Sequence, residues 1–172
     1  SRDAMAGEKG IHASVSGMAW TNSSQQGGSG PSGTTVLTHT DLIYNGKWWA
    51  IGAFAQFDKQ GANETDTGIG PKLELHWSVF YLEGGWAAIM QRSFTDRSIA
   101  KQTGSAWVIG TGVPVPLGRG ASSGGTPGAG AFFMQYSYKY RVQFIEKQDS
   151  VLLSDPIIQR DGYPLFGLGY RF

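Results

Sequence analysis

Apolar and polar residues alternate along two long stretches of the chain, residues 71–82 and 131–145. A period of two places successive side chains on opposite faces of a β-strand. Each stretch therefore predicts a strand with one apolar and one polar face. The apolar positions are Leu73, Leu75, Trp77, Val79 and Tyr81 in the first stretch and Phe132, Met134, Tyr136, Tyr138, Tyr140, Val142 and Phe144 in the second.

The same period continues to the end of the sequence. Phe166, Leu168, Tyr170 and Phe172 share one parity, whereas two glycines and Arg171 take the other. This pattern predicts a final strand with one apolar face. Weaker alternation predicts five more strands, over residues 9–20, 34–44, 48–57, 86–95 and 104–113.

These segments give eight strands, and a ninth candidate covers residues 150–160. A single-chain barrel with both termini on one side needs an even number of strands. We assign residues 150–160 to a loop, because Asp155-Pro156 lies in the middle and proline removes a hydrogen bond from the ladder of a central strand. The predicted fold is an all-β, transmembrane, antiparallel up-and-down β-barrel of eight strands. Ten strands are the alternative, with an extra pass between residues 86 and 130.

The connections between the strands alternate in length. Residues 45–47 and 83–85 contain Asn-Gly or Gly-Gly and predict tight hairpin turns. Residues 21–33 and 58–70 are polar and predict long loops, and residues 114–130 form a further long connection. Short turns at one end and longer loops at the other are typical of outer-membrane barrels.

Composition adds one constraint, a shortage of charge. The 172 residues suit one domain, with residues 1–8 as a polar N-terminal segment. Charged residues make up 16% of the chain, against roughly 25% in ordinary soluble domains. No run of about 18 apolar residues occurs, so a closed barrel is the predicted way to cross a bilayer. The net charge of +1 gives no electrostatic case for nucleic acid as a partner.

In its alternation, loop lengths and ending, the chain resembles small bacterial outer-membrane β-barrel proteins of the eight-stranded class. The closing strands of that class typically end in Phe, with aromatic or aliphatic residues at alternate positions before it. The resemblance implies integration in the outer membrane as a monomer, with membrane lipid and lipopolysaccharide as neighbours. It also implies that the barrel-assembly machinery reads Phe166, Leu168, Tyr170 and Phe172 as an insertion signal.

Aromatic residues near the strand ends and on the apolar parities fit the interfacial girdle of such a barrel. There a ring lies at the level of the lipid headgroups. Three successive tyrosines on one parity are also hard to bury in a small core. The predicted girdle contains Trp48, Trp49, Trp77, Tyr81, Tyr136, Tyr138 and Tyr140.

The polar parities are predicted to point into the barrel. Eight strands leave an interior just wide enough to be filled by side chains, and buried charges must be paired. The predicted interior set is Lys72, Glu74, His76, Arg92, Lys139 and Arg141. We expect an ion-paired plug and a structural role, or a narrow passive channel for small solutes. Because cations outnumber carboxylates in this set, such a path would weakly favour anions.

Two other functions remain open. Glu74, His76 and Ser78 share one parity and bring together the groups of a hydrolytic triad. The His-aromatic-Ser step resembles the motif of outer-membrane lipid A deacylases, which implies a lipid-modifying hydrolase. In that family the pair faces lipid and Asn follows the Ser, whereas here the trio takes the polar parity and Val79 follows. The simpler interpretation is a polar ladder without enzyme activity. A soluble β-barrel that binds a small molecule is the second alternative.

The sequence predicts no metal site and no other cofactor. Cysteine is absent, which excludes thiolate ligands. The three histidines, His12, His39 and His76, fall on three separate predicted strands, which makes a three-histidine site improbable.

Overall fold

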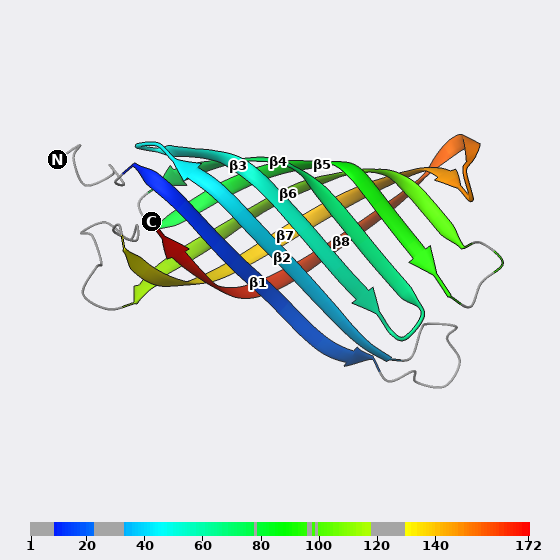
Figure 1. Cartoon of the computed structure of the whole chain (residues 1–172), viewed down its shortest axis with the longest axis horizontal. Helices are drawn as coiled ribbons and strands as arrows, with labels where there is room; N and C mark the ends of the chain where they lie inside the picture. The colour runs from blue at the N-terminus through cyan, green and yellow to red at the C-terminus, as the bar shows by residue number, and fades with distance from the viewer. Residues whose placement is uncertain (1–8, 23–32, 78, 96–97, 99, 118–129) are drawn as a thin grey trace.

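A computed structural model describes residues 9–22, 33–77, 79–95, 98, 100–117 and 130–172. Within these residues, eight strands form one sheet that closes in the order of the sequence, and all neighbouring strands are antiparallel (Figure 1). The strands are β1 (Gly10–Asn22), β2 (Gly33–Asn45), β3 (Trp49–Gln60), β4 (Glu64–Trp77), β5 (Phe80–Phe94), β6 (Lys101–Leu117), β7 (Ala131–Gln148) and β8 (Val151–Arg171). The predicted all-β, antiparallel up-and-down barrel of eight strands is confirmed.

The barrel has two ends, which we name the terminal rim and the far rim. The terminal rim holds the start of β1, the end of β8, the turn at residues 46–48, the end of β4 and the start of β5. The far rim holds the turns at residues 61–63 and 149–150. Among the described residues, no helix is long and apolar enough to span a membrane.

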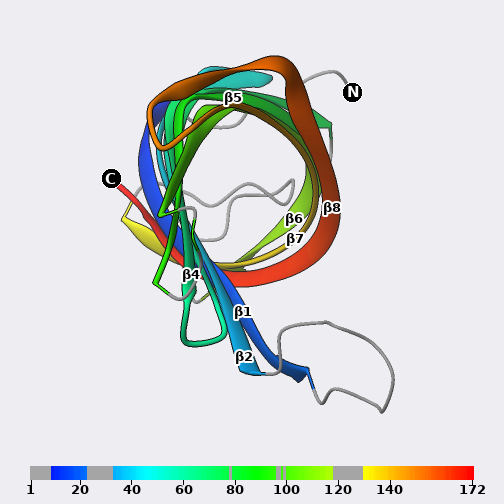
Figure 2. The same ribbon diagram turned by 90° about the vertical axis from the view of Figure 1, so that its right-hand side faces the viewer.

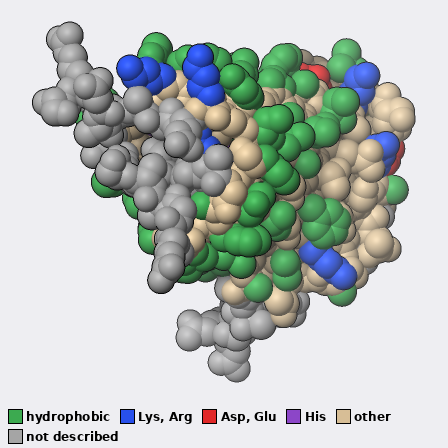
Figure 3. Space-filling model, turned by 60° about the vertical axis from the view of Figure 1, so that its left-hand side comes forward, with side chains coloured by type: hydrophobic (Ala, Val, Ile, Leu, Met, Phe, Trp, Pro, Cys, Tyr) green, Lys and Arg blue, Asp and Glu red, His purple; other side chains and the backbone are tan. Residues whose placement is uncertain are grey.

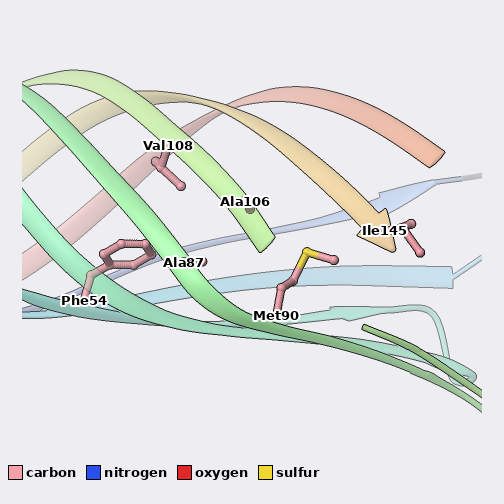
Figure 4. Packing of buried hydrophobic residues seen from close by; sticks show 6 residues of the cluster. All are labelled: Phe54, Ala87, Met90, Ala106, Val108 and Ile145. Atoms are coloured by element: carbon pink, nitrogen blue, oxygen red, sulfur yellow. The ribbon is translucent and has the colours of Figure 1, made fainter. Parts of the chain in front are cut away.

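Side chains alternate between the interior and the outer surface along the strands. In β7, the odd-numbered residues from Ala131 to Ile145 are buried, and the even-numbered residues from Phe132 to Tyr140 are exposed. The interior contains an apolar cluster beside its polar side chains, formed by Phe54, Ala87, Met90, Ala106, Val108 and Ile145 (Figure 4).

The barrel closes where β1 meets β8 near the terminal rim. Residues 12–17 of β1 pair with residues 166–171 of β8. Beyond these pairs, β1 continues to Asn22 and β8 reaches back to Val151, and the described residues show no pairing between them. Figures 1 and 2 show β1 and β2 diverging from β8 toward the far rim. We name the stretch where residues 18–22 and 161–165 run without pairing to each other the seam.

One predicted strand and one predicted turn are wrong. The chain does not run as one strand over residues 71–82, because β4 ends at Trp77 and β5 begins at Phe80. Residues 83–85 lie within β5 and do not form a turn. Gly85 lies within β5, where a Cβ atom would come within 2.7 Å of the Phe54 ring. The glycine therefore makes room for a core side chain and does not form a turn.

The predicted long loop over residues 58–70 is also wrong. β3 and β4 pair up to a turn at residues 61–63, where Gly61 has a φ of 62°. The polar residues of this segment include Asp58 and Asp66, whose side chains are buried inside the barrel. Short turns occur at both rims, so the predicted segregation of short turns from long loops is wrong for the described connections.

Residues 150–160 belong to β8 and are not the predicted loop. Asp149 and Ser150 form the turn after β7, with φ of 46° and 72°, and β8 pairs with β7 from Val151 onward. The proline argument failed because Pro156 lies at an irregularity of the β7–β8 ladder: Ile145 pairs with Ile157 and Lys147 with Leu152, and the residues of β8 between these pairs have no partner in β7. Proline is compatible with such a bulge, since no ladder hydrogen bond is needed there.

Three predicted segments fall wholly or largely outside the described residues. These are the polar segment 1–8, the loop 21–33 and the connection 114–130. Of the last segment, residues 114–117 continue β6 instead of forming a loop.

Candidate functional site

Lys72 is the centre of an ion cluster inside the barrel. Its Nζ atom lies 3.0 Å from an Asp41 carboxylate oxygen, 2.9 Å from Glu74 and 2.5 Å from Glu83. The Lys72 side chain is only 2% exposed. The inward positions of β2, β4 and β5 therefore place one cation among three carboxylates in a site shielded from water.

Glu83 links Lys72 to a second buried cation, Lys139 of β7. The other Glu83 carboxylate oxygen lies 2.6 Å from Lys139 Nζ. Beside the cation site, His39 lies 3.2 Å from Asp41 and stacks on Phe54. We name Lys72, Lys139, Asp41, Glu74 and Glu83 the central cluster. It crosses the interior from β2 to β7, and His39 connects Asp41 of this cluster to Phe54 of the apolar cluster.

A second set of ion pairs lies nearer the far rim. Arg92 donates two hydrogen bonds to the Asp66 carboxylate, at 2.6 and 2.7 Å, and one to Gln143 at 2.7 Å. Glu64 lies 3.2 Å from Arg92 Nε. The paired contact to Asp66 is the bidentate geometry in which guanidinium and carboxylate bind most strongly.

Arg141 forms the other half of this far set. It donates hydrogen bonds to Asp58 and to Asp161, the latter at 3.0 and 2.5 Å. Its guanidinium group also lies 5.5 Å from the centre of the Tyr163 ring. We name Arg92, Arg141, Asp58, Glu64, Asp66 and Asp161 the far cluster.

Carboxylates outnumber cations in the described part of the interior. The cations are Lys72, Arg92, Lys139, Arg141 and Arg171, and the carboxylates are Asp41, Asp58, Glu64, Asp66, Glu74, Glu83 and Asp161. The expected excess of cations is wrong, and so is the basis for a path that favours anions. The cations appeared to be in excess because three interior carboxylates were not assigned to strands. Glu83 fell in a predicted turn, and Asp58 and Asp66 fell in a predicted loop.

The structure places the predicted interior residues as follows. Lys72, Glu74, Arg92, Lys139 and Arg141 are buried, and His76 is partly buried. Sequence reasoning missed Asp58, Glu64, Asp66, Glu83, Asp161 and Arg171 as interior charges. Extending each alternating pattern to the nearest glycine turn would have placed Asp58 and Asp66 on the inward parity.

The candidate hydrolytic residues lie near the terminal rim. Glu74 Oε2 is 3.0 Å from His76 Nε2, and both line a cavity of about 20 Å³, which has room for about one water molecule. Ser78 lies outside the described residues. Because Glu74 also pairs with Lys72, this couple belongs to the interior network and points away from the outer surface.

The predicted aromatic girdle requires one correction. Tyr81 is 3% exposed and its hydroxyl accepts a hydrogen bond from Gln135 inside the barrel. Tyr81 belongs to β5 and not to the strand that ends at Trp77, so the alternation of residues 73–77 does not extend to it. The other girdle residues are exposed or, for Trp49, partly exposed: Trp48, Trp49, Trp77, Tyr136, Tyr138 and Tyr140.

The predicted insertion signal lies on the outer surface of β8. Phe166, Leu168 and Phe172 are exposed, and Tyr170 is partly exposed. The inward glycines between them serve packing: a Cβ on Gly169 would come within 2.2 Å of a buried phenylalanine ring.

The outer surface is apolar around the strands. In Figure 3, apolar side chains spread across the visible face and charged ones are few. Trp86 and Trp107 stack on this surface with ring centroids 5.9 Å apart, and both are exposed. In the described strands, exposed charged side chains occur only in the halves nearer the far rim: Lys59, Lys101, Glu146, Lys147, Asp155 and Arg160. We use the name apolar band for the exposed surface of the strands outside these charged positions; it includes Leu73, Trp86, Trp107 and Ile109.

The comparisons with known proteins give no family assignment. No protein-family model, curated protein or solved structure matches the chain. Within the described residues, no group of three or more histidine, aspartate or glutamate side chains is arranged to hold a metal ion.

Proposed function

We propose that the chain is an integral outer-membrane β-barrel with a structural role, whose interior is closed by ion pairs. The apolar band carries this proposal. Large exposed apolar surfaces are rare on soluble monomers, whereas an outer apolar belt and a polar interior are the distribution that lipid requires. A closed sheet also satisfies the backbone groups that lipid cannot.

The central and far clusters support a closed interior. A solute crossing the barrel would have to separate Lys72 from three carboxylates or Arg92 from Asp66, and each separation leaves buried charge uncompensated. Passive movement is therefore limited to very small solutes. An excess of carboxylates would favour cations over anions on any such narrow path.

The apolar band also indicates which molecules would contact the outside of the barrel. Membrane lipid and lipopolysaccharide would contact the apolar band and the aromatic girdle. The exposed aromatic face of β8, from Phe166 to Phe172, would be available to the assembly machinery. We propose a monomer, since the barrel closes within one chain. The inward direction of Glu74 and His76 gives the hydrolase alternative no support.

Conductance across a planar bilayer tests the closed interior. The protein is first folded into lipid vesicles, and folding is checked by a change in gel mobility between unheated and boiled samples. Vesicle fusion is then expected to give no steady conductance steps. As a comparison, Glu83→Ala removes the shared partner of two lysines and is expected to increase the current noise or produce small steps. Large steps from the wild-type barrel would contradict the proposal.

A further inference from the structure

Two histidines from different strands line one cavity near the terminal rim. His12 of β1 and His76 of β4 both line the cavity of about 20 Å³ to which Glu74 also contributes. The charges of Glu74 and His76 act on the His12 ring, which places the three groups close together. A space for about one water molecule can also hold a single ion of similar size. The fold therefore brings two imidazole rings from distant parts of the chain to one small space.

Glu74 orients the His76 ring. Its Oε2 atom lies 3.0 Å from His76 Nε2, and this nitrogen donates its proton to the carboxylate. In the neutral ring the lone pair is then on Nδ1, for which the described residues provide no hydrogen-bond partner. A carboxylate behind one ring nitrogen, with the other nitrogen available to coordinate, is the arrangement that orients metal-binding histidines in proteins.

Asn45 has the same position relative to the His12 ring. The side-chain amide of Asn45 lies 2.7 Å from His12 Nδ1, and the described residues provide no partner for Nε2. When the amide nitrogen faces Nδ1, the ring proton is on Nε2. A half-turn of the amide presents its oxygen instead, so that Nδ1 keeps the proton and Nε2 can bind a metal ion. This half-turn loses only the 3.4 Å contact between Asn45 and the Gly10 carbonyl.

Aromatic rings hold both imidazoles in place. His12 meets Phe133 edge to face, with ring centroids 5.6 Å apart, and the His76 ring lies 5.9 Å from the Tyr81 ring. Phe133 and Tyr81 are buried and line the same cavity. Ligands whose rings are already oriented lose little rotational freedom when they bind an ion.

The charges around the cavity favour an ion that nitrogen binds over one that needs oxygen ligands. Glu74 is the only carboxylate among the described residues of the lining, and it already pairs with Lys72 and His76. Arg171 also lines the cavity and repels any cation there. Ca²⁺ and Mg²⁺ depend on oxygen ligands, chiefly carboxylates, and one paired carboxylate does not provide them. Water reaches the site and screens these charges, because the His76 side chain is 19% exposed.

We propose that His12 and His76 bind one divalent transition-metal ion of the kind that imidazole ligands suit, Zn²⁺ or Cu²⁺. Water molecules complete the coordination, because within the described residues no group of three or more metal-binding side chains is arranged to hold an ion. The bound ion connects β1 to β4 across the interior, beside the central cluster. The site lies inside the barrel, so this inference does not depend on the proposed contact with lipid.

Electron spin echo spectroscopy of bound Cu²⁺ tests this proposal, because it detects the remote nitrogen of each coordinated imidazole. The barrel is folded in a zwitterionic detergent, checked by gel mobility, and given substoichiometric Cu²⁺. The folded wild-type protein is expected to show two coordinated imidazoles. The chain contains only three histidines, so each signal can be assigned by substitution.

Three substitutions assign the ligands. His12→Gln and His76→Gln should each leave one coordinated imidazole and lower the affinity for Cu²⁺ by at least about tenfold, since losing even an outer partner of a ligand costs about 10–100-fold. His39→Gln changes the histidine outside the cavity and should keep both imidazole signals. A large excess of Mg²⁺ should leave the wild-type signal unchanged.

Zn²⁺ provides a second readout that does not depend on copper. An ion that binds the folded chain stabilises it, so Zn²⁺ is expected to raise the urea midpoint of the wild-type protein. The midpoint of His76→Gln should not change with Zn²⁺. The same variant without metal gives the baseline for any cost of the substitution itself.

The spectra decide the proposal in the folded wild-type protein alone. One coordinated imidazole, or none, would overturn it, and copper held only by backbone nitrogen counts as none. Two imidazole signals that persist in His12→Gln or His76→Gln would also overturn it, because His39 would then be a ligand. Displacement of Cu²⁺ by Mg²⁺ would show an oxygen-ligand site in place of the proposed one.

Discussion

Lys72→Met is expected to lower the free energy of unfolding by about 3–5 kcal/mol. Among the described lysines and arginines, only Lys72 lies within ion-pair distance of Asp41 or Glu74, and it shares Glu83 with Lys139. Methionine fills a similar volume but leaves Asp41 and Glu74 buried without their lysine, whereas Glu83 keeps Lys139. Urea titration of the barrel in lipid vesicles measures the effect.

Two further variants show whether the loss in the free energy of unfolding comes from the missing ion pairs or from any substitution of a lysine. Lys59→Met changes an exposed lysine of β3 and should alter the free energy of unfolding by no more than about 0.5 kcal/mol. The double variant Lys72→Met, Glu74→Gln removes one stranded carboxylate and should recover part of the loss. A loss of less than about 1 kcal/mol for Lys72→Met would contradict the assigned role of the central cluster.

Ile109→Arg is the second change with a large expected effect. Ile109 lies in the middle of β6 on the apolar band and is 64% exposed. An arginine near the midplane of a bilayer destabilises a barrel by about 2–4 kcal/mol, whereas the same exposed site in water is nearly neutral. Urea titrations in vesicles are expected to show the larger value.

Val151→Arg provides the matched control for exposure. Val151 is 68% exposed, but it lies at the far rim beside the turn at residues 149–150. The expected loss is about 0–1 kcal/mol. Equal losses for the two arginine variants would mean that depth along the barrel has no influence, which argues against lipid around the apolar band.

Alternation predicted the number of strands and their outer faces because the side-chain period is a local property. Residues 131–145 alternate without interruption, and β7 follows that pattern throughout. The final strand is similar, with Phe166, Leu168 and Phe172 outside and Arg171 inside. When a strand lies between a polar interior and an apolar exterior, the alternation of polar and apolar residues in the sequence shows which residues face each side.

Turn positions were less predictable, because polar residues and glycines occur in both turns and interior faces. Gly84 and Gly85 resemble a turn, but Gly85 accommodates Phe54. Asp58 and Asp66 resemble loop residues, but they bind Arg141 and Arg92 from strands far along the chain. These pairings depend on which strands face each other across the barrel, and local sequence does not contain that information.

The proline rule failed for a related reason. It holds for a strand with neighbours on both sides, and a closed barrel was expected to provide them everywhere. Pro156 lies where the β7–β8 register shifts, and Pro164 lies where, among the described residues, β8 pairs with β7 alone, so both prolines are compatible with the strand. The positions of register shifts and the length of pairing between the first and last strands depend on how whole strands align, which the local sequence does not show.

Contact between the apolar band and lipid is the central claim, and fluorescence quenching by brominated lipid tests it most directly. A variant with Trp20, Trp48, Trp49 and Trp77 changed to Phe keeps only the exposed pair Trp86 and Trp107. In vesicles whose lipids carry bromine at the middle of the acyl chain, most of the fluorescence seen in unbrominated vesicles is expected to be lost. Equal fluorescence in the two kinds of vesicle would contradict the account.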